Sequence, residues 1–93
     1  MHARLVRSSI VAGQTYRYIM KMKELALPHY REQPGFENAY LMVDREKETS
    51  VLLTIFDTAE NLAASEKYAT HRIELDGVRD PPEVTYFEVI EKV

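Results

Sequence analysis

Three side chains in the second half of the chain have chemistry that an enzyme site could use: Tyr68, His71 and Arg72. A histidine titrates near neutral pH, so His71 could act as a general base. Arg72 could instead hold a carboxylate or a phenolate through paired hydrogen bonds. With Tyr68 as a further binding residue, this region could bind and deprotonate a small acidic compound. A solvated helix end is the commoner setting for such neighbours.

Four further candidates lie in segments that look like strands, namely Asn38, Tyr40, Phe56 and Tyr86. The two tyrosines could project a hydroxyl into a cavity, because a buried tyrosine usually has a hydrogen-bond partner. Tyr86 is therefore a catalytic candidate and Tyr40 a substrate-binding one. A buried Asn38 would need partners for its amide, either in a ligand or in the protein. Phe56 could line a substrate pocket, although ordinary packing is the commoner role of all three aromatic residues.

The composition excludes several kinds of site. The chain has no cysteine, which removes disulfides, thiolate catalysis and sulfur-ligated metals. Its three histidines are scattered, and only three glycines are present, so we expect no metal site, no phosphate-binding loop and no cofactor. Twelve basic residues against fifteen acidic ones give a net charge of −3, which does not favour binding to nucleic acid or to an acidic membrane.

The length of the chain and its first residues indicate how many domains to expect and whether a targeting or membrane segment is present. Ninety-three residues, 45% of them hydrophobic, fit one soluble domain over residues 1–93. No long apolar run follows Met1, so the sequence predicts neither a signal peptide nor a membrane span. A cytoplasmic location is the expectation.

Six elements are expected, in the order strand, helix, strand, strand, helix, strand. Their ranges are Ala3 to Ser9, Gln14 to about Tyr30, Phe36 to Val43, Val51 to Phe56, a helical region from Asp57 to about Ile73, and Val84 to Val93. Pro28 should kink or end the first helix. Asp57 and Glu60 form a capping-box pattern that predicts Asp57 as the N-cap of the second helical region. The order predicts an α+β, ferredoxin-like βαββαβ fold with an antiparallel sheet.

The two middle strands are apolar on both alternating faces. Phe36, Tyr40 and Met42 share one parity with Asn38, while Leu41 and Val43 fall on the other. A small sheet with one wet face should alternate apolar and polar residues, so both faces should be covered. Helices of the same chain can cover one face. The second face predicts a homodimer that forms through the sheets.

The stretch from Glu32 to Tyr40, with its Pro34-Gly35-Phe36 turn, is followed by a charged hairpin, by Leu52 to Asp57 and by Glu60 to Ser65. This combination resembles the antibiotic biosynthesis monooxygenase-like family. The resemblance covers about Gly13 to Ser65 and rests on structural signatures. It implies a small ferredoxin-like chain that dimerises into an α+β barrel, and it does not rest on a catalytic motif.

Enzymes of that family include cofactor-independent monooxygenases of phenolic compounds, quinol monooxygenases and haem-degrading enzymes. The haem-degrading branch has a characteristic asparagine in the first strand and a tryptophan in the second helical region. This chain has no tryptophan and no asparagine from Ala3 to Ser9, so haem degradation is disfavoured.

Two alternative functions, from different classes, are therefore considered. The first is a cofactor-independent monooxygenase or related oxidoreductase that binds a small aromatic phenol or quinol in an apolar barrel cavity. The second is a non-enzymatic dimer of the same fold that binds a small ligand or serves as an accessory protein. An RNA-binding sheet is excluded, because it would expose aromatic residues in basic surroundings.

Overall fold

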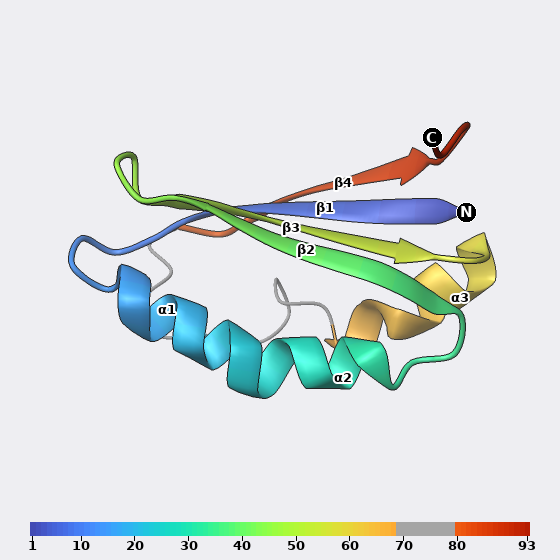
Figure 1. The fold of residues 1–93 in the computed structure, drawn as a ribbon, viewed down its shortest axis with the longest axis horizontal. Coiled ribbons are helices and arrows are strands. Elements are labelled where there is room, and N and C mark those ends of the chain that lie inside the picture. The colour runs from blue at the N-terminus through green and yellow to red at the C-terminus, as the bar shows by residue number, and fades with distance from the viewer. Residues whose placement is uncertain (69–79) are drawn as a thin grey trace.

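The computed structural model describes residues 1–68 and 80–93 of the chain. Four strands form one antiparallel sheet in the order β2-β3-β1-β4. The strands are β1 (His2–Ser9), β2 (Phe36–Asp44), β3 (Thr49–Phe56) and β4 (Glu83–Glu88). All described helices lie on one side of this sheet, and both termini lie at the same end of the molecule (Figure 1). The predicted ferredoxin-like α+β fold is confirmed.

Helical structure continues from Thr15 to Arg31 in three segments: α1 (Thr15–Lys21), the π-helical η1 (Met22–Ala26) and α2 (Leu27–Arg31). Pro28 lies in the first turn of α2. A proline within a helix lacks an N–H donor, and its ring collides with the carbonyl four residues earlier. The π-helical segment η1 ends at Ala26, two residues before Pro28, and it includes Glu24, whose carbonyl is the one four residues earlier. The helix therefore accommodates Pro28 and runs on to Arg31.

The second helical region begins one residue later than the sequence pattern predicts. The N-cap of α3 (Ala59–Ala64) is Thr58, whose hydroxyl accepts a hydrogen bond of 3.1 Å from the backbone N–H of Asn61. The Asp57 carboxylate instead accepts from the side-chain amide of Asn61 at 2.8 Å. Asp57 as the N-cap was thus wrong, since both residues can cap and Thr58 has the extended backbone that the position needs. A 3₁₀ helix, η2 (Ser65–Tyr68), follows α3.

The last strand is shorter than predicted. β4 ends at Glu88, which is the residue opposite His2 at the start of β1. His2 is the first residue of β1, and the ladder between β1 and β4 ends at this pair. One backbone bond of 2.8 Å, from the Val89 N–H to the Met1 carbonyl, continues the contact.

A β-bulge in β2 changes the face on which its first residue lies. Phe36 is opposite Phe56, whereas Asn38 is opposite Ile55, so the register shifts between Phe36 and Asn38. Phe36 therefore lies on the helix-covered face and packs edge-to-face on Phe56, with 5.8 Å between ring centroids. The prediction that Phe36 shares a face with Asn38 and Tyr40 was wrong, because a bulge inserts one residue and reverses the alternation before it.

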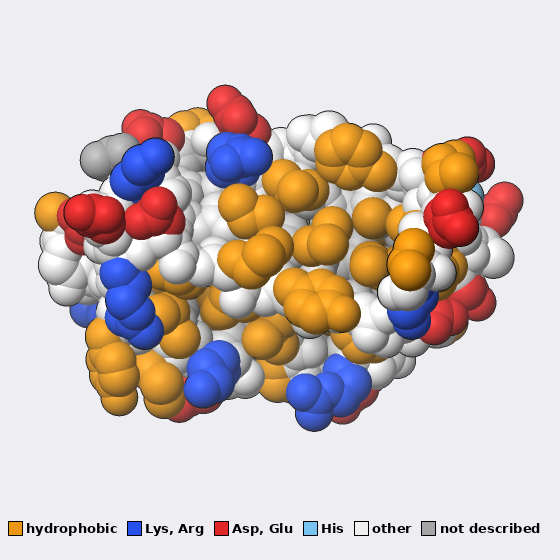
Figure 2. All heavy atoms as spheres, turned by 45° about the horizontal axis from the view of Figure 1, so that its top comes forward, with side chains coloured by type: hydrophobic (Ala, Val, Ile, Leu, Met, Phe, Trp, Pro, Cys, Tyr) orange, Lys and Arg blue, Asp and Glu red, His pale blue; other side chains and the backbone are white. Residues whose placement is uncertain are grey.

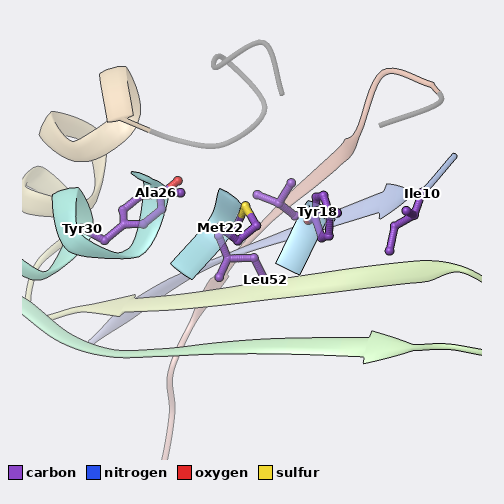
Figure 3. Close-up of a cluster of buried hydrophobic side chains, with 7 residues drawn as sticks. Ile10, Tyr18, Met22, Ala26, Tyr30 and Leu52 are labelled. Atoms are coloured by element: carbon purple, nitrogen blue, oxygen red, sulfur yellow. The ribbon is translucent and has the colours of Figure 1, made fainter. Parts of the chain in front are cut away.

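The hydrophobic core lies between the helices and the inner face of the sheet. Figure 3 shows side chains from the first helical segments lying against the strands. The buried cluster consists of Val6, Ile10, Tyr18, Met22, Ala26, Tyr30 and Leu52. Within it the Tyr18 hydroxyl shares a 2.6 Å hydrogen bond with the Ser50 hydroxyl. Burial raises the pKa of Tyr18 above its ordinary value of 10.0, although hydrogen bonds from Ser50 and Ser8 oppose the shift.

No helix within residues 1–68 and 80–93 lies on the outer face of the sheet. Figure 2 shows hydrophobic side chains gathered in the middle of this face, with charged side chains toward its edges. By strand register the group comprises Leu5, Tyr40, Met42, Val51, Leu53, Ile55 and Phe87. Tyr40, Met42 and Phe87 are 53%, 47% and 49% exposed. We call this group the outer apolar face.

Candidate functional site

A fully buried arginine lies on the inner face of β1. Arg4 has no exposed surface, and its guanidinium lies 5.7 Å from the centre of the Tyr30 ring. It reaches this position because Arg4 and Val6 share the parity of β1 that faces the helices. A buried charge is costly unless it is paired and hydrogen-bonded, so its partners identify the polar centre of the domain.

Glu66 of η2 supplies the counter-charge. Arg4 Nη1 donates to Glu66 Oε2 at 2.8 Å, and Nη2 donates to the Ser65 hydroxyl at 3.2 Å. The Ser65 hydroxyl in turn donates to the Leu62 carbonyl at 2.7 Å. The end of α3 and the start of η2 are thereby tied to the centre of the sheet. Arg4 Nε is buried and has no hydrogen-bond partner among the described residues.

Tyr86 of β4 completes the cluster. Its hydroxyl donates to Glu66 Oε1 at 2.9 Å, so each oxygen of the carboxylate is bound by a different strand. Arg4 and Tyr86 are opposite each other in the register of β1 and β4, which explains why one glutamate can reach both. Arg4, Glu66 and Tyr86 form a continuous chain from the buried core to the surface, because Tyr86 is 54% exposed. We call these three residues the charge chain.

A groove opens beside the outer end of the charge chain, between α3 and β4. It has a volume of about 350 Å³ and a largely apolar surface. Its lining consists of His2, Ala59, Leu62, Ala63, Tyr86, Phe87 and Glu88. Pockets for small molecules are typically apolar with a few polar groups, and they measure roughly 300–1,000 Å³. The α3–β4 groove has this character and is near the lower end of that range.

Two groups, one in the groove lining and one behind it, could exchange protons with a ligand. His2 and Glu88 are cross-strand partners in the register of β1 and β4. His2 is half-buried, and an imidazole is the side chain best suited to accept a proton near neutral pH. Glu66 is the second group, reached through the Tyr86 hydroxyl.

The structure brings only part of the predicted set to this site. Tyr86 lies at the groove, and Tyr68 ends η2, the segment that begins with Ser65 and Glu66. Tyr40 and Asn38 lie on the opposite face of the sheet, because their register partners Leu53 and Ile55 face outward. A single cavity that contains both Tyr40 and Tyr86 is therefore not formed within one chain.

The remaining predicted site residues are Phe56, His71 and Arg72. Phe56 is fully buried against Phe36 and belongs to the core. His71 and Arg72 lie outside the described residues.

Sequence reasoning missed Arg4, Glu66 and His2. Arg4 looks like an ordinary strand arginine, and the available signal was that it shares the inward parity with Val6. A charge on that parity must be paired when the sheet is covered. Nothing in the sequence shows that Glu66 is the partner, because 62 positions separate the two residues.

Other parts of the described chain offer less. A hollow of about 480 Å³ at the β2–β3 hairpin includes Arg7 and Lys47, yet it lies beside the outer apolar face. Among residues 1–68 and 80–93 no three histidines or carboxylates come together as metal ligands would. No described helix is both long and apolar enough to cross a membrane.

Solved structures share this fold at low sequence identity. The chain superposes on the heme-degrader MhuD from Mycobacterium tuberculosis, solved with two hemes in its active site, with a TM-score of 0.77 and 18% identity, covering 100% of this chain and 99% of that one. For a protein named antibiotic biosynthesis monooxygenase, the TM-score is 0.73 with 15% identity, and the match covers 98% and 100% of the two chains.

A third similar structure is SnoaB, a cofactor-independent oxygenase from Streptomyces nogalater, in its N63A mutant form. The TM-score is 0.72 with 15% identity, and the match covers 99% of this chain and 96% of that one. No family model and no curated protein matches the sequence. The chain therefore has the fold of the antibiotic biosynthesis monooxygenase proteins, as the sequence resemblance predicts.

Proposed function

We propose that this chain is a cofactor-independent oxygenase of small phenolic compounds, which bind in the α3–β4 groove. One observation carries the proposal: the lining of an apolar groove of about 350 Å³ includes Tyr86, whose hydroxyl is hydrogen-bonded to Glu66, the ion-pair partner of Arg4. The apolar lining would desolvate an aromatic ring. His2 or the Tyr86–Glu66 pair would accept the phenolic proton.

The chemistry needs no group beyond substrate and dioxygen. Loss of the phenolic proton gives a phenolate, whose electron-rich ring carbon can reduce dioxygen directly. A phenol with a free para position and one O₂ then give one quinone and one water, so one oxygen atom enters the ring and the other leaves as water. The name of SnoaB, a cofactor-independent oxygenase of the same fold, supports this reaction class.

Haem degradation is not proposed, although MhuD has the same fold. The groove formed by the described residues is near the lower end of the size range for ligand pockets, which suits one or two rings better than a macrocycle. The chain also lacks tryptophan altogether.

We further propose that the working form is a homodimer joined through the outer apolar face. Tyr40, Met42 and Phe87 are each about half exposed there, which is unusual for large apolar side chains gathered on one surface. A second copy presents the same apolar surface, so a two-fold contact is self-complementary. Phe87 belongs to this face and also to the lining of the α3–β4 groove, so the groove would lie beside the dimer contact.

A non-enzymatic ligand-binding or accessory protein is the second candidate. The half-open groove supports it, because binding alone requires only shape and a few polar groups. In that case the charge chain would orient the ligand without moving a proton.

Oxygen uptake separates the two candidates. A panel of phenols and hydroquinones should stimulate oxygen consumption above that of heat-denatured protein. Tyr86→Phe should lower the rate at least tenfold, within the range for a positioned proton-transfer group. Tyr16→Phe is the matched control, since Tyr16 is 74% exposed on α1 and does not line the groove. Ligand binding without any oxygen consumption across the panel would support the second candidate and contradict the first.

A further inference from the structure

We infer that the α3–β4 groove is completed by a second copy of the chain, so that a ligand in the groove and the partner subunit strengthen each other's binding. This inference rests on the proposed function and on the homodimer proposed with it, and it specifies how binding in the groove is regulated. The element that joins the two binding events is β4.

The last three residues of β4 form one wall of the groove. Tyr86, Phe87 and Glu88 all belong to its lining, together with His2 and residues of α3. The shape of the groove therefore depends on where β4 lies relative to α3.

β4 has little buried surface of its own. It lies at one edge of the described sheet, next to β1, and five of its six residues are exposed while Val84 is partly buried. A segment with few buried apolar contacts opens locally at a lower free energy than the core does. Within the described residues of a single chain, this wall of the groove is therefore weakly supported.

Phe87 connects the wall of the groove to the outer apolar face. By strand register it lies opposite Ala3 and belongs to the outer apolar face, and it also lines the groove. In the single chain Phe87 is 49% exposed. A second copy that covers the outer apolar face buries more of this side chain, which is a favourable apolar contact added directly to β4.

The two binding events then stabilise the same strand. A partner subunit holds β4 through the outer apolar face, and a ligand holds it through the groove. Whichever binds first orders β4, so the second binds a strand that is already in place, and the coupling is positive. Linkage requires this coupling to be reciprocal.

The size of the effect can be stated in advance. At the lower end of the usual range of coupling, a ligand should bind the dimer about fivefold more tightly than the monomer. A dimer has two grooves, so a saturating ligand should tighten dimerisation by the square of this factor, about 25-fold.

Ligand affinity in a monomeric variant tests one direction of the coupling. Tyr40→Glu places a charge in the outer apolar face, and Tyr40 lies in β2, at the opposite edge of the sheet from β4 and outside the groove lining. Titration calorimetry with 1-naphthol under nitrogen should give about fivefold weaker binding by Tyr40→Glu than by the unmodified chain. Tyr16→Glu is the control, because Tyr16 is exposed on α1 and its variant should keep both the dimer and the affinity.

Hydrogen exchange shows whether β4 carries the effect. Backbone amides of β4 should exchange faster in Tyr40→Glu than in Tyr16→Glu, whereas those of β3 should exchange alike in the two variants. Unchanged exchange in β4 of a monomeric Tyr40→Glu would contradict the inference.

The unmodified chain tests the other direction without any substitution, and it decides the question if Tyr40→Glu does not fold. Sedimentation velocity over a dilution series should give a dimer dissociation constant about 25-fold lower with saturating 1-naphthol than without it.

The outcomes separate the inference from the proposals on which it rests. A dimer dissociation constant that naphthol leaves unchanged or raises would overturn the inference and leave the proposed groove in place. A chain that stays monomeric at every concentration would overturn the homodimer and this inference with it. Failure of naphthol to bind either form would contradict the proposed function itself.

Discussion

At the scale of single residues, the buried ion pair between Arg4 and Glu66 is the feature that couples structure to the proposed chemistry. Only a quarter of the Glu66 side chain is exposed, and none of Arg4 is. Such a pair contributes little more to the free energy of unfolding than apolar residues of the same shape would. Removing one partner lowers that free energy strongly, because the other charge stays buried. A role of the carboxylate in binding the Tyr86 hydroxyl would account for the presence of this pair.

Removal of one partner should therefore lower the free energy of unfolding more than removal of both partners. Glu66→Ala should lower the free energy of unfolding by about 3 kcal/mol, since it leaves the Arg4 charge buried and unpaired. The double variant Arg4→Met with Glu66→Ala should recover part of that loss. Urea unfolding of both variants measures the difference. Equal stabilities, or a less stable double variant, would mean that the ion pair does not hold this geometry in solution.

The hydroxyl of Tyr18 gives a second prediction, which depends on pH. Burial raises its pKa above 10.0, so above pH 10 the unfolded chain loses this proton before the folded chain does. The contribution of Tyr18 is then fully present below pH 10 and is lost as the pH rises toward the folded pKa. Tyr18→Phe should be less stable by about 1 kcal/mol at pH 7.5, because Ser50 loses its partner.

That deficit should shrink at pH 10.5 and above. Urea unfolding at both pH values measures it, with the exposed Tyr16→Phe as the control variant. A deficit that is the same at pH 7.5 and pH 10.5 would show that Tyr18 titrates as an ordinary tyrosine.

At the scale of elements, the order of strands and helices follows from local sequence patterns. The predictions that were wrong concern details set by contacts between residues distant in the sequence. Alternation in the strands and helical spacing in residues 14–30 were sufficient to predict the βαββαβ order. The bulge between Phe36 and Asn38 was not predictable, because it is defined by pairing with β3. The prediction of the site was incomplete for the same reason. Arg4, Glu66 and Tyr86 come from three separate elements and meet only in the folded sheet.

The turn before β2 offers a test of such a long-range constraint. Gly35 has φ of 78°, and a Cβ atom there would collide with the Asp57 carboxylate and the Asn61 amide. Gly35→Ala should lower the free energy of unfolding by about 2 kcal/mol or more, from backbone strain and overpacking together.

Gly13 is a matched control for Gly35. Its φ is 80°, and nothing lies within 4 Å of the position that a Cβ would occupy. Gly13→Ala should then lower the free energy of unfolding through backbone strain alone, by about 1 kcal/mol. Equal losses in thermal or urea unfolding would show that the packing of the turn against α3 is not tight.

At the scale of the whole molecule, the two faces of the sheet have different proposed roles. The inner side holds the core and the groove, and the outer apolar face is proposed to bind a second copy. Sedimentation velocity at micromolar concentration should give a dimer. Tyr40→Glu should give a folded monomer, because it places a charge in the middle of an apolar contact, whereas Tyr16→Glu on the helical side should remain dimeric. A monomeric unmodified protein would contradict the dimer proposal.

The place where a phenolic ligand binds tests the proposed function most directly. Nuclear magnetic resonance of the labelled full chain, titrated with 1-naphthol under nitrogen, reports the contact surface residue by residue. We expect the largest amide shifts at His2, Ala59 to Ala63 and Tyr86. Shifts centred instead on Tyr40, Met42 and Leu53 would place the ligand on the outer apolar face and contradict the assignment of the site to the α3–β4 groove.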